Sequence, residues 1–313
     1  MILKSILLGG AMVLSLGVAA SAADKVPVTV GITVGTLANP FFTPLVAGAK
    51  AAVLQANPKA TVNTVGADYD LAKQTNQIDS FLSAGANLIL VNAVDVNAVA
   101  PAIQRAKAAG IVIGAFDVSA KGADVTVMTN NKQAGEIACA YLAEQLKGQG
   151  KVIIINGPPV SSIIDRVAGC KSALAKSPGI EILSDDQDGK ASRDGGLAVM
   201  QSLLTRFPHV DATFSANDPT AIGADLAARQ LGRKEMIIAG VDGSPDMVAA
   251  LKSPESRIVA SASQDPYGMA YEATELAIGV MQGRTPAQPV KLLDTQLVTK
   301  ENAATFRGWD APR

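Results

Sequence analysis

A regular alternation of two kinds of segment constrains the fold of this chain more than any other feature. Short runs rich in Val, Ile and Thr alternate along almost the whole sequence with longer Ala-rich segments in which apolar residues recur at helical spacing. The runs at 153–155 and 237–241 are apolar without a break, which is typical of strands covered on both faces. Strands that alternate with helices build parallel sheets, so the sequence predicts an α/β, doubly wound fold.

The alternation predicts strands and helices at specific positions. The predicted strands are Val28–Val34, Thr61–Val65, Leu88–Asn92, Val112–Asp117, Val125–Thr129, Val152–Asn156, Ile180–Ser184, Ala212–Ser215, Met236–Val241 and Ile258–Ser263. The predicted helices are Phe42–Gln55, Ala72–Ser83, Val96–Ala109, Gln133–Lys147, Arg166–Lys176, Gly195–Arg206, Thr220–Gln230 and Tyr267–Gln282. So many strands exceed one compact core, and at about 150 residues per domain a chain of 313 residues suggests two domains. No Pro-, Gly- or Ser-rich linker separates the halves, which favours ordered crossings over a flexible tether.

The N-terminus has the three parts of a secretory signal peptide. Lys4 supplies a positive charge, residues 6–20 are apolar apart from Ser15, and Ala20-Ser21-Ala22 is a site of small residues. The apolar run is shorter than the roughly 20 residues that a spanning helix needs, which disfavours an uncleaved membrane anchor. We therefore expect a signal peptide over residues 1–22, cleavage near Ala22, and a soluble, exported product.

Composition excludes several classes of function. With 27 Lys+Arg against 28 Asp+Glu, the chain lacks the positive charge that nucleic-acid binding requires. A single histidine leaves little for metal or acid/base chemistry. Cys139 and Cys170 both fall on predicted helices of one domain, so in an oxidising compartment they could form a disulfide; the alternative is two small buried apolar residues.

Polar side chains stand where the predicted strands end, and in doubly wound sheets ligands bind outside these carboxyl ends. Nearly all of them carry planar groups that form two hydrogen bonds, and none is a good nucleophile or a histidine: Asn39, Asn92, Asp117, Arg166, Asn217, Asp242 and Gln264. Such groups match vicinal hydroxyls. Phe41 and Phe42 follow at the same edge, where an aromatic face can lie against the C–H face of a sugar. The set indicates a neutral, polyhydroxylated ligand.

Each of these residues also has a purely structural interpretation, which the sequence leaves open. Asn39-Pro40 and Asn217-Asp218-Pro219 are typical helix starts, with Asn as the cap and Pro in the first turn. The segment 242–246 is typical of a turn that leads into a capped helix. Phe41 and Phe42 could be core residues, and an isolated arginine such as Arg166 is most often a surface cation.

Five motifs in order resemble a known family. They are Thr36-Leu37-Ala38-Asn39-Pro40-Phe41-Phe42, Leu90-Val91-Asn92-Ala93-Val94-Asp95, Ser215-Ala216-Asn217-Asp218, Gly240-Val241-Asp242-Gly243-Ser244-Pro245-Asp246 and Ala262-Ser263-Gln264. Over nearly its whole mature length the chain resembles the periplasmic sugar-binding proteins of ABC importers, in the ribose-binding branch of the type I periplasmic binding proteins. The resemblance implies two parallel-sheet lobes joined by three hinge crossings. It divides the chain into residues 24–129 plus 264–292, residues 130–263, and a tail, 293–313, that we expect to return to the second lobe.

The resemblance also implies roles. Residues of both lobes would contact the ligand together only in the closed form, which a membrane permease then recognises: Asn39, Phe41, Phe42, Asn92 and Asp117 from the first lobe, Arg166, Asn217 and Asp242 from the second, and Gln264 at a crossing. The partners implied are a small neutral sugar or polyol and the permease of an ABC importer. We expect no catalysis, no cofactor, no metal, no nucleic acid, and a monomer. A sensor that presents the sugar to a chemoreceptor or sensor kinase is the alternative.

Two positions depart from the ribose-binding pattern. Val118 follows Asp117 where an arginine is usual, and Ala191 stands where a stacking aromatic is expected. Losing a charged donor costs roughly 1.5–3 kcal/mol for a ligand that needs it, about tenfold to a hundredfold in affinity. A different pentose, a branched sugar or a small polyol is therefore as good a prediction as ribose. Lys190 and Arg193 are the cations near enough in sequence to compensate.

Other functional classes lack their motifs. There is no glycine-rich phosphate or dinucleotide loop and no nucleophile elbow, and His209 falls in a predicted helix-to-strand turn. The acidic run Asp185–Gly189 lacks the glutamate that would complete a calcium loop, so we predict a solvated acidic loop. A transcriptional regulator with a similar sugar-binding core would need a helix-turn-helix head, where this chain has a signal peptide.

Overall fold

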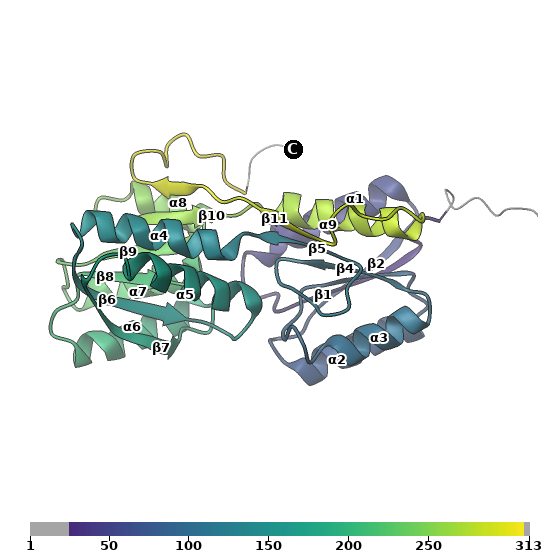
Figure 1. The fold of residues 1–313 in the computed structure, drawn as a ribbon, viewed down its shortest axis with the longest axis horizontal. Helices are drawn as coiled ribbons and strands as arrows, with labels where there is room; N and C mark the ends of the chain where they lie inside the picture. Colours follow the sequence, from purple (N-terminus) through teal and green to yellow (C-terminus); the bar gives the residue numbers. More distant parts are fainter. Residues whose placement is uncertain (1–24, 310–313) are drawn as a thin grey trace, which may run out of the picture.

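The computed structural model describes residues 25–309 and contains two six-stranded sheets that lie side by side along the long axis (Figure 1). The predicted signal peptide, residues 1–22, lies outside the described residues. The first sheet, in spatial order, is β11 (Val290–Leu293), β5 (Val125–Thr129), β4 (Val112–Phe116), β3 (Leu88–Val91), β1 (Thr29–Val34) and β2 (Thr61–Gly66). The second is β12 (Leu297–Thr299), β10 (Ile258–Ser263), β9 (Ile237–Asp242), β8 (Ala212–Ser215), β6 (Gln149–Asn156) and β7 (Gly179–Asp188).

Helices cover both faces of each sheet, and we call each sheet with its helices a lobe. In the first lobe, α1 (Phe42–Ala56) and α9 (Pro266–Met281) lie on one face, and α2 (Leu71–Ser83) and α3 (Ala100–Ala108) on the other (Figure 1). In the second lobe, α4 (Asn131–Gln145) and α5 (Ser161–Leu174) cover one face, and α6 (Arg193–Arg206), α7 (Asp218–Gln230) and α8 (Pro245–Lys252) the other. This arrangement confirms the predicted α/β, doubly wound fold.

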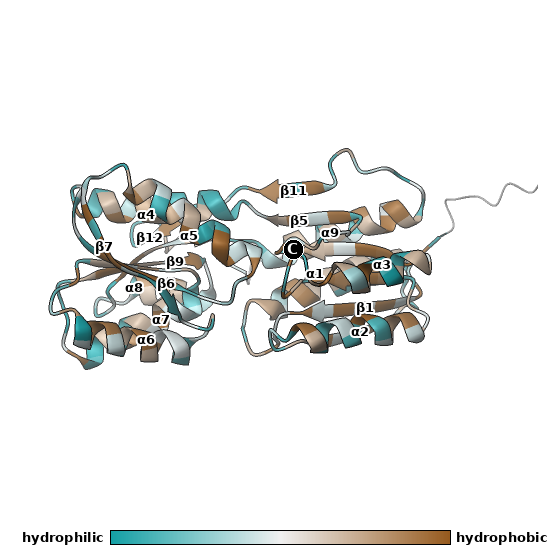
Figure 2. Cartoon of the chain, turned by 60° about the horizontal axis from the view of Figure 1, so that its bottom comes forward, coloured by the Kyte–Doolittle hydropathy of each residue, from teal (hydrophilic) through white to brown (hydrophobic). Residues whose placement is uncertain are grey.

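The two-residue period of the strands divides the core between the two faces. In β3, Leu88 and Leu90 pack on the side of α1 and α9, whereas Ile89 and Val91 pack on the side of α2 and α3. All four side chains are fully buried, which explains the unbroken apolar run in the sequence. Figure 2 shows hydrophobic residues in the strands and both hydrophobic and hydrophilic residues along the helices.

Each sheet reverses its strand order at one point, and this point places the site. All pairings are parallel except that of β12 with β10. The chain runs outward from β1 to β2 and then back to β3, and it repeats the pattern from β6 to β7 to β8. Open α/β sheets bind ligands at the carboxyl end of such a switch point.

Three segments carry the chain between the lobes: the one between β5 and α4, the one between β10 and α9, and the one between β11 and β12. Backbone bonds join them, since Asn130 N–H donates to the oxygen of Leu293 at 2.8 Å and Ser263 N–H donates to the oxygen of Gln296 at 2.7 Å. The hydroxyl of Thr295 also donates to the oxygen of Ser263 at 2.6 Å. The three crossings therefore form one hydrogen-bonded strip rather than separate tethers.

Helices α4 and α5 approach so closely that glycine is required where they touch. A Cβ on Gly135 would lie 1.9 Å from the backbone oxygen of Arg166, and one on Gly169 would lie 2.1 Å from that of Lys132. A disulfide between Cys139 and Cys170 joins the same two helices, with their Cα atoms 5.0 Å apart. This pairing settles the alternative that the sequence left open.

The structure corrects three predicted elements. The acidic run Asp185–Asp188 is not a loop, because it continues β7 along the ladder with β6. The helix predicted from Val96 begins at Ala100, since the carboxylate of Asp95 accepts two backbone N–H groups and holds residues 96–99 in a turn. The helix predicted from Arg166 begins five residues earlier, so Arg166 lies inside α5.

Candidate functional site

Both sheets direct their carboxyl ends toward one cavity between the lobes. This inner cavity, of about 40 Å³, is lined by every residue that the sequence predicts to contact a ligand: Asn39, Phe41, Phe42, Asn92, Asp117, Arg166, Asn217, Asp242 and Gln264. Each of these side chains is buried. Residues that are far apart in the sequence thus meet because the switch points of the two sheets face each other.

On the first-lobe side, an amide and a carboxylate form a fixed pair at the switch point. Asn92 follows β3 and accepts the N–H of Gly35, after β1, at 2.9 Å; its amide donates to the carboxylate of Asp117 at 2.7 Å. The buried side chain of Gln74 holds this turn, donating to the oxygen of Asn92 at 2.8 Å. Asp117 sits in the left-handed backbone region, with φ 67°, a strained conformation that directs its carboxylate into the cavity.

On the second-lobe side, a buried guanidinium organises the site. Arg166 donates to the side-chain oxygen of Asn131 at 2.8 Å, to the backbone oxygen of Ala216 at 2.9 Å, and to the carboxylate of Asp242 at 3.2 Å. Both partners of the Arg166–Asp242 ion pair are nearly inaccessible to solvent. A planar guanidinium held from several directions presents its remaining N–H groups in a fixed orientation.

A chain of hydrogen bonds links this charge pair to a crossing. The amide of Gln264 donates to the carboxylate of Asp242 at 2.7 Å, while its oxygen accepts the hydroxyl of Thr129 at 2.6 Å. Thr129 ends the last central strand of the first lobe, and Asp242 ends β9 in the second. Gln264 therefore connects the crossing between β10 and α9 directly to the polar residues of the inner cavity.

The two phenylalanines serve the core and the cavity together. Phe41 and Phe42 pack edge to face, with ring centroids 5.5 Å apart, inside the apolar cluster of α1 and α9. They also line the inner cavity. The core interpretation and the binding interpretation are thus both compatible with their positions.

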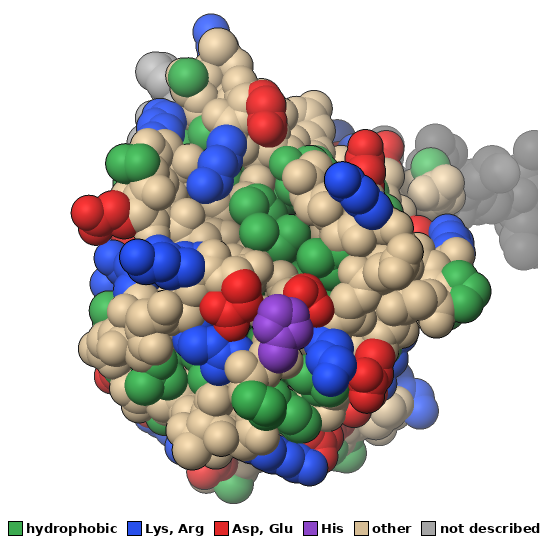
Figure 3. Space-filling model, turned by 90° about the vertical axis from the view of Figure 1, so that its left-hand side faces the viewer, with side chains coloured by type: hydrophobic (Ala, Val, Ile, Leu, Met, Phe, Trp, Pro, Cys, Tyr) green, Lys and Arg blue, Asp and Glu red, His purple; other side chains and the backbone are tan. Residues whose placement is uncertain are grey.

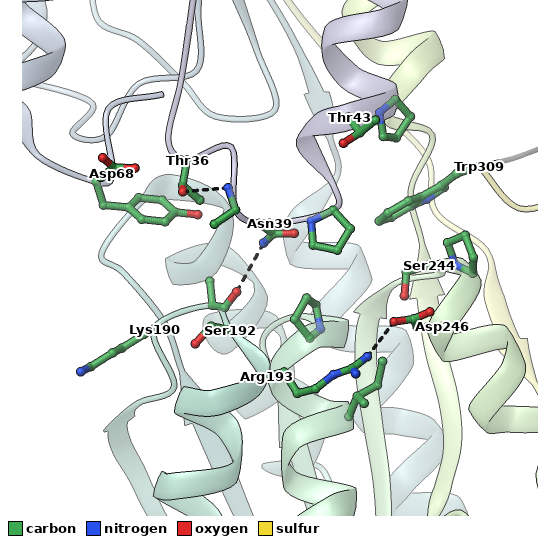
Figure 4. A pocket seen from close by; sticks show the side chains of 18 of the residues that line it. Thr36, Asn39, Thr43, Asp68, Lys190, Ser192, Arg193, Ser244, Asp246 and Trp309 are labelled. Atoms are coloured by element: carbon green, nitrogen blue, oxygen red, sulfur yellow. Dashed lines mark hydrogen bonds and ion pairs between the residues drawn. The ribbon is translucent and has the colours of Figure 1, made fainter. Parts of the chain in front are cut away.

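Asn39 and Asn217, the two asparagines that precede helices, each accept a local backbone N–H and also line the inner cavity. Asn217 caps α7, accepting the N–H of Thr220 at 3.1 Å, and the oxygen of Asn39 accepts the N–H of Phe41 at 3.0 Å. The amide of Asn39 points the other way and donates across the cleft to the backbone oxygen of Ala191 at 3.4 Å (Figure 4). The cap fixes Asn217, and the local turn bond fixes Asn39, at the mouth of the cavity. The N-cap of α1 is Phe41, which makes no side-chain cap bond, so the prediction that Asn39 caps this helix is wrong.

Burial shifts the acidity of the carboxyls in and beside the cavity. It raises the pKa of Asp117 to about 6, and the nearby charge of Arg166 limits the rise. Burial also raises the pKa of Asp218 and of Asp242, and Arg166 opposes the rise only at Asp242. One guanidinium thus faces two carboxyls, those of Asp117 and Asp242, an electrostatic setting that favours hydrogen-bond donors over anions as ligands.

Sequence reasoning missed one aromatic residue of the site. Tyr69 follows β2 in the left-handed backbone region, with φ 56°, and lines the inner cavity beside Asp117. Burial, and then the charge of Asp117, raise the pKa of its hydroxyl. The sequence signal that could have identified Tyr69 is its position just after a strand next to the switch point. Ala191 has the equivalent position after β7 in the second lobe.

The two departures from the ribose-binding pattern lie at the cavity itself. Val118 and Ala191 are both buried and both line it. Neither of the cations suggested as substitutes enters: Arg193 pairs with Asp246 at 2.6 Å with about half of its side chain exposed, and Lys190 is exposed. The expectation that either would compensate for Val118 is therefore wrong for this arrangement.

In the described part of the chain, neither the histidine nor a cluster of metal-ligating side chains forms a competing site. The single histidine, purple in Figure 3, is exposed on the end of the second lobe, where His209 contacts Asp211 at 2.8 Å. Within residues 25–309, no group of three His, Cys, Asp or Glu could hold a metal ion. In the same range, the helices are too short or too polar to cross a bilayer.

Comparisons with known proteins agree with this geometry. Residues 30–285 match the family described as periplasmic binding protein domain. The ribose import binding protein of Bacillus subtilis is 30% identical over 276 residues, covering 86% of this chain and 88% of the relative. The xylitol-binding protein of Mycolicibacterium smegmatis is 31% identical over 191 residues, covering 60% of this chain and 54% of that protein. Among solved structures, an ABC transporter solute-binding protein from Mycobacterium smegmatis with bound glycerol has a TM-score of 0.84 at 28% identity, covering 91% of this chain and 99% of that one.

Proposed function

This chain belongs to the periplasmic binding proteins, in their ribose-binding-like branch, and we propose that it captures a small neutral sugar or polyol between its lobes for delivery to the permease of an ABC importer. Its relatives are solute-binding proteins, so the chain is a binding protein and not an enzyme. The observation that carries the proposal is the inner cavity, where planar hydrogen-bonding groups from both sheets and two phenylalanines meet.

Closure of the lobes couples to binding because the contacts are divided between them. Asn92 and Asp117 come from the first lobe, whereas Arg166, Asn217 and Asp242 come from the second. A ligand that contacts both sets has higher affinity for the closed form and shifts the population toward it. The permease then recognises the closed surface, which is mainly populated when the ligand is bound. We propose that the three crossings are the hinges, at the lobe boundaries predicted from the sequence.

The composition of the cavity suits uncharged polyols and sugars, of which ribose is one candidate among several. Hydroxyls can donate to Asp117 and Asp242 and accept from Arg166 and the amides, so each polar group has a partner. Val118 removes the charged donor that the ribose-binding pattern has at this position, and Ala191 removes the aromatic. Relatives named for ribose and for xylitol, and a neighbour with bound glycerol, cover this range of ligands.

Membership of the family places the chain in the periplasm. We propose that residues 1–22 direct its export, with cleavage near Ala22. N-terminal sequencing of the protein recovered from the periplasm tests this step. A product that still begins at Met1 would contradict it.

Calorimetric titration of the mature protein tests the binding proposal. The panel contains pentoses, branched sugars and polyols of four to six carbons, and we expect at least one to bind. Asp117→Ala should weaken that ligand at least tenfold, because a buried charged acceptor is lost. Asp79→Asn, an exposed carboxylate paired with Arg105 on the outer face, is the matched control. A panel with no binder would overturn the sugar or polyol assignment, and an unchanged Asp117→Ala would overturn the site.

A further inference from the structure

A second and much larger cavity opens directly beside the inner one. This outer cavity has a volume of about 700 Å³ and lies between the lobes at the mouth of the cleft (Figure 4). It shares Asn39, Tyr69 and Ala191 with the inner cavity, so the two are adjacent and these three residues form the boundary between them. The small side chain of Ala191 stands at this boundary. Anything bonded to a ligand in the inner cavity at this side would extend into the outer one.

The wall of the outer cavity is largely apolar, in contrast to the polar inner cavity. Its larger apolar residues come from both lobes and from the C-terminal tail: Pro40, Pro44, Pro219, Ile222, Pro245 and Trp309. Prolines in the first turn of α7 and α8 lack an N–H to offer, and they present C–H surface instead. Figure 4 shows Trp309 and Asp246 on one side of the cavity, with Asp68 and Lys190 on the other.

Trp309 contributes an apolar surface and no free donor. Its indole N–H is already bonded to the backbone oxygen of Asp242 at 3.2 Å. Its ring packs edge to face on Phe41, which fixes its orientation. A flat aromatic surface held in this way is suited to contact with an apolar or aromatic group.

The charged residues that line the outer cavity balance, Lys190 and Arg193 against Asp68 and Asp246, which favours an uncharged occupant. Helices α6, α7 and α8 begin here, but Ser192, Asn217 and Ser244 each accept a first-turn N–H, so these donors are satisfied. Their first turns also carry carboxylates that oppose the positive helix ends. Arg193 is paired with Asp246 (Figure 4).

The loops that border the two cavities hold a strained backbone. Asp68 and Tyr69, after β2, have φ values of 53° and 56°, and Lys190 and Ala191, after β7, have φ values of 54° and 47°. None of them is glycine, so each of these conformations has an energetic cost. Strain at matching positions of both lobes indicates that these loops are shaped for a site rather than for stability.

We propose that the outer cavity is a second subsite of the cleft, which takes an uncharged, apolar group bonded to the sugar or polyol in the inner cavity. The ligand class is then a glycoside or ether with an alkyl or aryl substituent. This proposal rests on the function proposed above, because the inner cavity must hold the polar part. It adds Trp309 and Ile222 as residues that select the substituent.

Titration with substituted ligands tests the subsite. The probes are the free sugars and polyols of the panel and their O-methyl and O-phenyl derivatives. We expect an O-phenyl derivative of a bound sugar or polyol to bind about tenfold more tightly than its O-methyl counterpart, the effect of burying roughly 55 Å² of ring at about 25 cal/mol per Å². Ile222→Trp, which narrows the outer cavity with a bulky ring, should remove most of this gain and leave the affinity for the free compound unchanged.

The control is Ile164→Trp, which adds the same side chain at a position that is 55% exposed and lines neither cavity. It should leave the gain from the phenyl group intact. If no O-phenyl derivative binds more tightly than its O-methyl counterpart while free compounds bind, the subsite is overturned and the proposed function stands. If no free compound and no derivative binds, both proposals are overturned. A gain that persists in Ile222→Trp would also overturn the subsite.

Discussion

Trp309 donates its indole N–H to the backbone oxygen of Asp242 across 67 residues of chain, at 3.2 Å. Asp242 ends β9 in the second lobe, while the ring of Trp309 packs on Phe41 of the first lobe, with centroids 5.7 Å apart. One side chain near the C-terminus thus contacts both lobes beside the candidate site. The contact stabilises the arrangement in which the lobes are close.

Trp309 variants should therefore weaken ligand binding without unfolding the protein. Trp309→Phe keeps the ring contact and loses one neutral hydrogen bond, worth about 1 kcal/mol, so we expect affinity for a bound sugar or polyol to fall about fivefold. Trp309→Ala also loses the packing and should bind more weakly still. Titration calorimetry measures both. Equal affinity in all three proteins would show that the tail does not contribute to closure.

Arg166 is expected to be the most sensitive single position for stability. Arg166→Met leaves the buried carboxylate of Asp242 without its cation, and breaking a buried pair costs about 3–5 kcal/mol of unfolding free energy. Urea denaturation measures this loss. Lys171 lies on the same helix as Arg166, and Lys171→Met, which breaks an exposed ion pair with Asp185 of β7, should cost less than about 1 kcal/mol.

A second substitution tests the reason for that loss. Arg166→Met combined with Asp242→Asn removes the unpaired charge, so part of the lost stability should return. A double variant that is less stable than Arg166→Met alone would mean that the loss comes from packing of the arginine stem. Adding Asp242→Asn to Lys171→Met should restore no stability, because Lys171 pairs with Asp185 and not with Asp242.

The disulfide should contribute to stability through the unfolded chain. Cys139 and Cys170 enclose a loop defined by a separation of 31 residues, for which the chain-entropy estimate is about 3–4 kcal/mol. Wild-type protein should lose this amount in urea denaturation when dithiothreitol is added. The double variant Cys139→Ala, Cys170→Ala should be insensitive to dithiothreitol. A wild-type unfolding midpoint that dithiothreitol does not move would contradict the prediction.

The local sequence pattern predicts most of the central strands of this fold, because buried parallel strands consist of continuous runs of apolar residues. It fails for β11, whose Val290 and Leu292 are about half exposed, so its order comes from pairing with β5 and not from burial. Likewise, the acidic residues of β7 do not favour a strand by themselves, but the ladder with β6 extends through them. Pairing between distant segments decides these elements.

The same distinction applies to the site. Asn92 and Asp117 are predictable because each closes a buried strand, and the fold class says that such ends hold ligands. Tyr69 is harder to predict, since its place depends on a left-handed turn after β2. Trp309 is not predictable from local sequence at all, because it lies in an irregular tail and reaches its partners only through the return of β12 to the second sheet.

The pH dependence of stability provides the last test, and its sign follows from the buried carboxyl of Asp117. Burial raises its pKa from 3.8 to about 6 in the folded protein. The folded chain therefore holds this proton more tightly than the unfolded chain does. The resulting stabilisation is fully present below about pH 4 and is lost as the pH rises through about 6, by about 3 kcal/mol in total.

Asp117→Asn removes this titration and leaves Asp218 and Asp242 in place. Urea denaturation between pH 4.5 and pH 7.5 should show wild-type stability falling more steeply with rising pH than that of the variant, which should be the more stable protein at pH 7.5. The variant should nevertheless bind the sugar or polyol more weakly, because an amide cannot replace a charged acceptor. Parallel pH curves would mean that Asp117 is hydrated in solution and keeps its ordinary pKa.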